Sequence, residues 1–329
     1  MRVTVVVLLL SFLWGGIAHG AGVRRSIFAL DPNGAEIASL RRGIQVMQSR
    51  PPTDPTSWIY QANIHGTSDQ PARTAWNTCT HRNFFFFSWH RMYLYYLERI
   101  LRAASGDPNL ALPYWNYTDD PNLPDPDRRQ LPLAFRQPGD SSNPLFVAQR
   151  NPAINNGMAL PPGAVDYSQA FMVTNFEAPA GSGFASFGGG AIPQPLHVDL
   201  DQNEGALETT PHDTVHVDIG GWMGSINLSA RDPIFYLHHA NIDRLWKRWL
   251  ALGGGRQDPV SDQVWMNTMF TFFDENGQQV QLSGKDILDT VGQLNYCYDD
   301  EPGCIMPPPA QKIPITVHIG GYWILLGGG

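Results

Sequence analysis

Two stretches of the chain decide its fold. Residues 79–99 read CTHRNFFFFSWHRMYLYYLER, and residues 232–246 read DPIFYLHHANIDRLW. Both combine histidine with dense aromatic and aliphatic residues. The apolar spacing of the first predicts a helix over residues 83–104, and the second predicts a helix over residues 232–252 that starts at its Asp-Pro pair. Histidines therefore lie on or beside two long helices.

The rest of the chain predicts a mainly helical protein with few strands. Apolar periodicity indicates a helix over residues 36–49, and residues 212–217 fit a short helix. Residues 113–211 are rich in proline, glycine and asparagine, which indicates long loops packed around helices. Residues 280–329 hold short β-like runs, of which the alternating residues 313–319 are the clearest.

The composition limits the class of function. The 329 residues are 43% hydrophobic and 16% charged, which suffices for a sizeable core and is too apolar for a disordered chain. The 32 glycines and 27 prolines show no period, so a collagen-like chain is excluded. The net charge is −8 and no basic stripe occurs, so nucleic acid is not an expected partner. Three cysteines are too few for a disulfide scaffold.

Residues 1–20 have the pattern of a secretory signal peptide. Arg2 precedes an apolar run over residues 3–14, and small residues then lead to a cleavage site after Gly20. The run is short for a membrane span, so stable insertion is not expected, and an N-terminal anchor is the alternative. We expect an exported protein, secreted or periplasmic, in which disulfides can form.

Six histidines fall into two groups: His65, His81 and His90, and His212, His216 and His239. His81 and His90 are nine residues apart and would point to opposite sides of one straight helix, so we place His90 on the aromatic helix and His81 before it. His212 and His216 share a helix face at i, i+4, which suits chelation of one metal by two imidazoles.

Sites built only from imidazole suit copper or zinc better than calcium or magnesium. Three nitrogens per metal leave one position open for catalysis. No H-E-x-x-H motif occurs, so a zinc metalloprotease would lack its general base. The alternative for each histidine is a packed, hydrogen-bonded core residue, and His318 is expected to be structural or exposed.

The two opening stretches closely resemble the copper-binding segments of the tyrosinase and catechol oxidase (polyphenol oxidase) family, the type-3 dicopper proteins. Residues 211–216, PHDTVH, resemble the first half of the family's second copper site, and residues 296–298, YCY, resemble its tyrosine motif. The resemblance covers about residues 35–300. It implies a mainly α fold, with a four-helix bundle housing a dinuclear copper site, long irregular loops and a few short β-strands. The implied divisions are a signal peptide (1–20), a dicopper catalytic domain (21–300) and a short C-terminal tail (301–329).

The resemblance assigns the metal ligands residue by residue. One copper is assigned to His65, His81 and His90, and the other to His212, His216 and His239. In the pair of adjacent histidines the second matches the ligand, and His238 is expected to orient the ligand rings. Asp243 is expected either to do the same or to form a helix cap or a surface salt bridge.

The three cysteines receive separate roles. Cys79 lies two residues before His81 and matches family members in which this cysteine forms a thioether bond to the histidine ring; a buried free thiol is the alternative. Cys297 and Cys304 then remain, seven residues apart in an exported chain, as a candidate disulfide.

The activity that the resemblance implies is oxidation of phenols and o-diphenols to o-quinones with dioxygen, as a catechol oxidase, a tyrosinase or both. Dioxygen and small phenols are the expected partners, and the oligomeric state is not predicted. A hemocyanin-like oxygen carrier and an o-aminophenol oxidase are the alternatives. A zinc hydrolase is disfavoured, because no paired carboxylates accompany the histidines.

Three positions are expected to tune that activity. Glu208 matches the family glutamate that orders a water near the site and, with Asp213, would help to deprotonate a monophenol. Glu204 is the substitute for Glu208, and a solvated surface carboxylate is the alternative for either. Ile226 aligns with the gate over the second copper, for which plain core packing is the alternative.

The C-terminal end departs from many family members, which carry a large C-terminal domain over the active site. Only residues 299–329 follow the tyrosine motif, so we expect an enzyme that is not latent. The β-like residues 313–319 are interpreted either as a remnant of such a cover or as an edge strand on the core.

Overall fold

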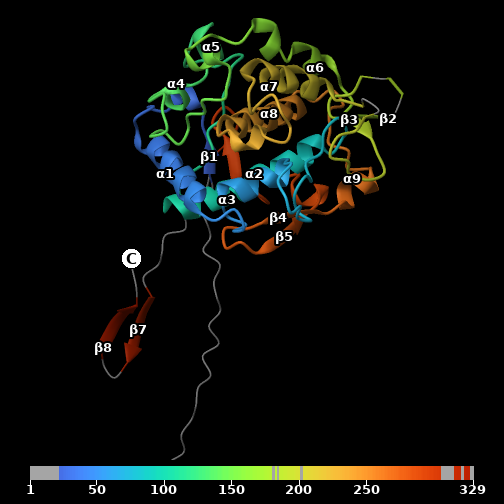
Figure 1. The fold of residues 1–329 in the computed structure, drawn as a ribbon. Coiled ribbons are helices and arrows are strands. Elements are labelled where there is room, and N and C mark those ends of the chain that lie inside the picture. Colours follow the sequence, from blue (N-terminus) through green and yellow to red (C-terminus); the bar gives the residue numbers. More distant parts are fainter. Residues whose placement is uncertain are drawn as a thin grey trace, which may run out of the picture.

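The structure is a computed structural model that describes residues 22–179, 182–183, 185–200, 203–304, 315–319 and 322–326. It is mainly helical, with a few short strands (Figure 1). The helices are α1 (Ala35–Ser49), α2 (Trp58–His65), α3 (Phe86–Ser105), α4 (Leu133–Arg136), α5 (Pro152–Asn155), α6 (Ser168–Met172), α7 (Thr214–Ile219), α8 (Ile234–Ala251) and α9 (Gln263–Asn267). The mainly α class predicted from the sequence is confirmed.

The strands form separate two-stranded sheets. The parallel pairs are β1 (Gly22–Arg24) with β6 (Tyr296–Tyr298), and β2 (Glu177–Pro179) with β3 (Gly189–Ala191). The antiparallel pairs are β4 (Phe270–Phe273) with β5 (Gln279–Leu282), and β7 (Ile315–Ile319) with β8 (Tyr322–Leu326). Strand β7 therefore pairs within its own hairpin and is not an edge strand of another described sheet.

The aromatic helix α3 is buried along most of its length. Its apolar residues pack against α1 and α8, and Gly106 ends it in the left-handed conformation, with φ 68°. The predicted helix over residues 83–104 is thus confirmed within three residues at its start. Asn83 instead makes the turn before α3, because its side-chain oxygen accepts the N–H of Phe85.

Helix α8 begins two residues later than predicted. The Asp232 carboxylate accepts the N–H of Ile234 and also receives two hydrogen bonds, of 2.7 and 2.8 Å, from Arg150. Both charged side chains are fully buried, so this ion pair ties the loop between α4 and α5 to the start of α8. Helices α3 and α8 pack together, while the complete four-helix bundle stays a prediction.

The segment before α7 is kinked. A helical turn over Glu208–Asp213 is interrupted at Thr210, whose φ of −148° and ψ of 122° are extended. Pro211 then starts a regular turn that continues into α7. His212 and His216 therefore lie one turn apart on the same helical run, as their spacing predicted.

Asp243 differs from its prediction. It is buried on α8 and accepts hydrogen bonds of 2.6 Å from each of three groups, the guanidinium of Arg91 and the hydroxyls of Tyr296 and Tyr298. It therefore neither orients a histidine nor forms a surface salt bridge. Its role is to join α3, α8 and β6 in the interior.

Candidate metal centre

The first histidine triad comes from three consecutive segments. His65 is the last residue of α2, His81 lies in the connection before α3, and His90 lies on α3. Their ring centroids are separated by 5.2 Å (His65 to His81), 5.5 Å (His65 to His90) and 5.2 Å (His81 to His90). The rings form a nearly equilateral triangle, and all three residues are buried. The placement of His81 before the helix and His90 on it is confirmed.

The second triad is tighter. The Nε2 atom of His239, on α8, lies 3.3 Å from Nε2 of His212 and 3.4 Å from Nε2 of His216. Three imidazole nitrogens thus converge on one point, which is the arrangement that a single metal ion requires.

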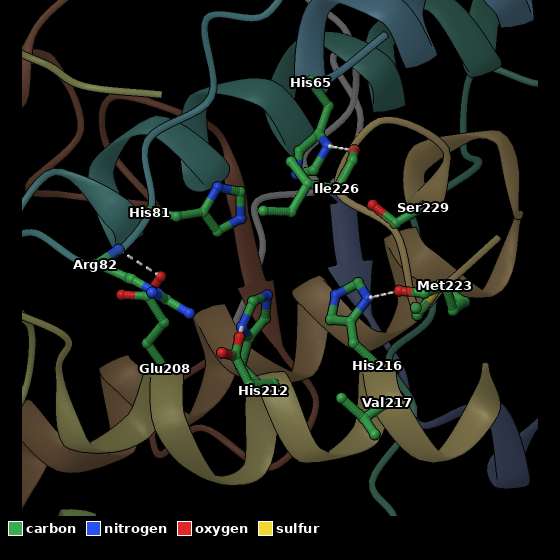
Figure 2. A pocket seen from close by; sticks show the side chains of 12 residues that line it. His65, His81, Arg82, Glu208, His212, His216, Val217, Met223, Ile226 and Ser229 are labelled. Atoms are coloured by element: carbon green, nitrogen blue, oxygen red, sulfur yellow. Dashed lines mark hydrogen bonds and ion pairs between the residues drawn. The ribbon is translucent and has the colours of Figure 1, made fainter. Parts of the chain in front are cut away.

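The two triads face each other. The rings of His90 and His239 stack with their centroids 4.4 Å apart, and the rings of His81 and His212 are 5.9 Å apart. Figure 2 shows His65 and His81 on one side of a pocket and His212 and His216 on the other. Two ions held by these triads would therefore be neighbours.

Backbone oxygens fix the direction of the rings. The Nδ1 of His65 donates to the carbonyl of Ile226 at 3.1 Å, that of His90 to Phe86 at 2.7 Å, and that of His216 to Met223 at 2.7 Å. Because the proton sits on Nδ1, the Nε2 atom keeps its lone pair for a metal. The Nε2 atoms of His65 and His90 are buried without any partner in the described ranges. Buried nitrogens without a hydrogen-bond partner have the environment expected of metal ligands.

The electrostatics agree with neutral imidazoles. Burial lowers the pKa of His65, His81, His90 and His239 well below the usual histidine value, and it lowers the pKa of His216 to about 3. Neutral imidazole is the form that binds a transition metal. The donor set therefore fits two soft or borderline ions such as copper.

His238 is adjacent to the second triad. Its ring stacks on His212 with the centroids 5.4 Å apart and the planes at 17°, and its Nδ1 lies 3.3 Å from the hydroxyl of Tyr117. It belongs to the same four-histidine group, and its Nε2 has no partner in the described ranges. The short Nε2 distances favour His239 as the ligand, with His238 supporting His212.

Cys79 is a buried free thiol in the structure. Its Sγ lies 3.3 Å from Nδ1 of His81 and 3.1 Å from Nδ1 of His197. The sequence analysis did not single out His197, which lies in an irregular loop and belongs to no histidine spacing pattern. His197 and Cys79 are 118 residues apart in the sequence, so only the fold brings them into contact.

Three carboxyl groups lie beside the second triad. Oε1 of the buried Glu208 accepts the backbone N–H of Arg82 at 2.7 Å, and burial raises the pKa of Glu208 well above its usual value. Asp213 accepts a 2.8 Å hydrogen bond from Nδ1 of His212. Burial, and then a hydrogen bond to Asp213, raise the pKa of Glu204 to about 8.

A pocket opens over the two triads. It has a volume of about 140 Å³ and is lined by His65, His81, Arg82, Glu208, His212, Asp213, His216, Val217, Met223, Gly224, Ile226 and Ser229. A cavity of this size holds about one aromatic ring. Ile226, 39% exposed, lines the pocket next to His65, which donates to its carbonyl (Figure 2). Glu208 and Asp213 line this pocket, as does Arg82, which the sequence analysis did not consider.

Comparison with known families now decides the classification. The model of the common central domain of tyrosinase matches residues 55–252, a range that holds both triads. The chain belongs to the tyrosinase family. The polyphenol oxidase middle domain matches residues 259–304. The resemblance inferred from the two opening stretches is confirmed.

Named relatives cover most of this tyrosinase-family chain. It is 37% identical over 312 residues to tyrosinase HcTyr1 of Hahella sp. (strain CCB-MM4), spanning 85% of this chain and 64% of that relative. It is 34% identical over 273 residues to the chloroplastic catechol oxidase B of Solanum tuberosum, spanning 76% and 44%. The chain thus spans between 42% and 64% of the length of such curated relatives.

Solved structures agree with the fold. The polyphenol oxidase of Grenache (Vitis vinifera) has a TM-score of 0.68 at 28% identity, covering 91% of each chain. A latent aurone synthase has a TM-score of 0.69 at 26% identity, covering 85% of this chain and 57% of that one. The description of a similar active aurone synthase names a copper B site. Family membership and the two triads together identify the cofactor as two copper ions in a dinuclear site.

Within the described ranges, no helix combines the length and the apolar character needed to cross a lipid bilayer. The predicted signal peptide lies outside the described residues.

Proposed function

We propose that this chain catalyses the oxidation of phenols and o-diphenols to o-quinones with dioxygen, as a type-3 copper oxidoreductase. The observation that carries the proposal is the pair of facing, buried histidine triads beneath a pocket of about 140 Å³. Relatives named tyrosinase and catechol oxidase support the same reaction class.

The six histidines hold the copper ions through Nε2, while backbone carbonyls orient several of the rings through Nδ1. When bound, the copper pair supplies electron exchange with dioxygen and the phenol. The protein keeps the imidazoles neutral by burial and holds the triads at a fixed separation. It thereby meets the metals with a preformed site rather than one that must be ordered on binding.

The pocket positions the aromatic ring of the substrate. Val217, 72% exposed, and Ile226 line the entry with apolar atoms, and the histidine rings form the floor. A flat ring that enters displaces water from the floor, which strengthens the polar interactions there. The size of the pocket favours substrates with a single ring next to the metals.

Glu208 is the proposed proton acceptor for a monophenol. One of its oxygens is held by the Arg82 backbone N–H, and the other, Oε2, has no partner among the described residues. Glu208 lines the pocket, whereas Glu204 turns to Asp213. Asp213 accepts a hydrogen bond from Nδ1 of His212. It therefore links the carboxyl groups of Glu204 and Glu208 to the second triad.

We also propose that Cys79 is joined to the ring of His81 by a thioether. The 3.3 Å separation of Sγ and Nδ1 places the sulfur against that ring. The bond would restrict rotation of the imidazole. Formation of the bond removes the thiol hydrogen and one ring hydrogen, with dioxygen as the two-electron oxidant. The mature protein would then be lighter by two hydrogen atoms than the same disulfide-bonded chain with a free Cys79, which intact-mass measurement detects. The mass of the unbridged chain together with a titratable thiol would contradict the bond.

The proposed catalytic domain covers residues 21–300, and residues 301–329 follow it. Pairing of β1 with β6 supports a domain that begins near residue 21. The disulfide between Cys297 and Cys304 supports export, because such bonds persist in oxidising compartments. N-terminal sequencing that finds the mature protein starting elsewhere than after Gly20 would contradict this assignment.

The deciding experiment is oxygen uptake by the copper-loaded protein with a catechol and with the matching monophenol. The metal-free and zinc-loaded proteins serve as controls. Uptake with catechol alone would indicate a catechol oxidase, and uptake with both would indicate a tyrosinase. Reversible oxygen binding without turnover of either phenol or of an o-aminophenol would contradict the proposal and favour a carrier.

A further inference from the structure

Arg82 is the cationic side chain among the residues that line the pocket. It follows the ligand His81 directly and is half-buried. Figure 2 draws it beside Glu208, on the side of the pocket between His81 and His212. A guanidinium at this place is not needed to hold a metal, because it repels cations.

The guanidinium of Arg82 has no hydrogen-bond or ion-pair partner in the part of the chain that the structure describes. Arg82 attracts the nearby Glu204 and Glu208 by charge alone, while Oε1 of Glu208 accepts the backbone N–H of Arg82, Asp213 accepts from His212, and Glu204 bonds to Asp213. The buried Arg150, in contrast, pairs with Asp232 through two hydrogen bonds. The N–H donors of the Arg82 guanidinium are therefore not used by another described side chain and can bind a group that enters the pocket.

The backbone holds Arg82 in place. Its φ is 61°, in the left-handed region that residues other than glycine rarely adopt. The 2.7 Å hydrogen bond to the buried Glu208 keeps the N–H in this orientation. Residues held in such conformations concentrate at functional sites, because the surrounding structure must stabilise them.

The pocket size decides which part of a substrate meets Arg82. A volume of about 140 Å³ takes one aromatic ring over the histidines and little more. A substituent on that ring must therefore extend along the wall or the rim. Arg82 offers the positive charge there, and a carboxylate is the group that a guanidinium binds with two parallel hydrogen bonds.

We propose that Arg82 binds the carboxylate of the substrate, so that the site selects phenols that carry a carboxylate side chain over neutral phenols of the same size. This inference rests on the proposed phenol oxidation and names its substrate class. Asp213 opposes an anion here, as does Glu208 when it is ionised, whereas Asp213 is itself hydrogen-bonded to His212 and Glu204.

The test compares 3-(3,4-dihydroxyphenyl)propanoate with its methyl ester, which differ in charge and share the ring. In the Arg82→Gln variant we expect KM for the acid to rise about tenfold and KM for the ester to stay unchanged. A tenfold rise corresponds to the lower end of the energy of a hydrogen bond to a charged group, because Arg82 is half-exposed. Arg82→Lys should restore part of the loss. Arg82→Asn should match the Gln variant while tolerating the left-handed backbone.

Lys285→Gln is the matched control, because it removes one positive charge from an exposed position that does not line the pocket. Equal changes in KM for the acid and the ester in Arg82→Gln would overturn the proposal. A change in KM for the acid alone in Lys285→Gln would overturn it as well. Binding of 3-phenylpropanoate and 3-phenylpropanamide to the metal-free protein gives a readout without turnover. If the wild type oxidises neither catechol, the proposed reaction is wrong. In that case, a loss of 3-phenylpropanoate binding confined to the Arg82 variants would still support Arg82 as a carboxylate site.

Discussion

At the residue scale, the two nitrogens of each imidazole ring decide whether a histidine can bind a metal. In His65, His90 and His216 the Nδ1 atom is occupied by a backbone carbonyl. The opposite nitrogens point inward, and those of His65 and His90 are buried without partners among the described residues. A structural histidine would satisfy both nitrogens, because an unpaired buried polar atom is costly. The geometry therefore favours metal binding over core packing.

The second triad gives the first prediction. In His216→Ala, one of three converging nitrogens is lost, so we expect the protein to retain one copper and to lose turnover. Elemental analysis of copper per chain measures this. His238→Ala is the control, because that ring stacks on His212 without a short Nε2 contact. If His238→Ala loses a copper and His216→Ala keeps both, the ligand assignment is wrong.

Glu208 gives the second prediction. Burial raises the pKa of its carboxyl group, and a proton acceptor must be ionised. Hydroxylation of monophenols should therefore increase as pH rises through this raised pKa, whereas a group with a lowered pKa would already be active at acidic pH. In Glu208→Gln we expect the monophenol rate to fall by about 10² or more and its rising limb to disappear.

Diphenol oxidation separates this role from a structural one. It should change far less in Glu208→Gln, because an o-diphenol needs no hydroxylation. Glu204→Gln is the matched control, since Glu204 does not line the pocket. Equal losses for monophenol and diphenol would show that Glu208 only supports the fold.

The clustering of the six histidines was predictable from the sequence, whereas their surroundings were not. Histidine spacing and the two family-like stretches depend on neighbours in the chain. The contacts of Cys79 with His197 and of Arg82 with Glu208 join residues 118 and 126 positions apart. No local pattern records such pairs, because they arise only when distant loops fold against the site.

At the element scale, the helices carry the triads and the loops orient them. Helices α3 and α8 were predictable because their apolar residues repeat with the helical period. The loop between α7 and α8 was not, although its carbonyls at Met223 and Ile226 hold two ligand rings. Backbone carbonyls carry no side-chain signal, so the sequence could not show that this loop orients both triads.

The approach of α2 to this loop gives the third prediction. A Cβ at Gly66 would lie 2.5 Å from the Ile226 carbonyl oxygen, the atom that accepts the hydrogen bond from His65. Gly66→Ala must displace the loop, so we expect copper affinity to fall about 10–100-fold and stability to fall by about 1–3 kcal/mol. Titration against a copper chelator measures the affinity.

Gly163→Ala is the control, because a Cβ there would meet no atom within 4 Å. It should leave copper affinity unchanged. Unaltered copper binding in Gly66→Ala would mean that the His65 hydrogen bond does not orient the ligand.

At the scale of the whole molecule, buried charges join segments that lie far apart in the sequence. Arg24 of β1 donates to Glu98 on α3 at 2.9 Å and to the hydroxyl of Tyr298 on β6 at 3.1 Å. Its guanidinium also lies over the ring of Tyr296, 3.7 Å from the centroid. Glu98 continues the network to Arg102. These charges join α3 to β1 and β6, which lie near the two ends of the proposed catalytic domain.

This network gives the last prediction, a comparison of two adjacent arginines. Arg24 is fully buried, whereas Arg25 pairs with Glu36 at an exposed site, where the two side chains are 44% and 58% exposed. In Arg24→Ala the buried carboxylates lose a cation but keep Arg102 and Arg91, so we expect a loss of about 3 kcal/mol, the lower end for a broken buried pair. Arg25→Ala should change the free energy of unfolding little, because exposed pairs are screened by water. Denaturant unfolding of both variants measures the free energy of unfolding. Similar losses in the two variants would show that strand pairing with β6, and not the buried charges, fixes β1 to the copper-binding helices.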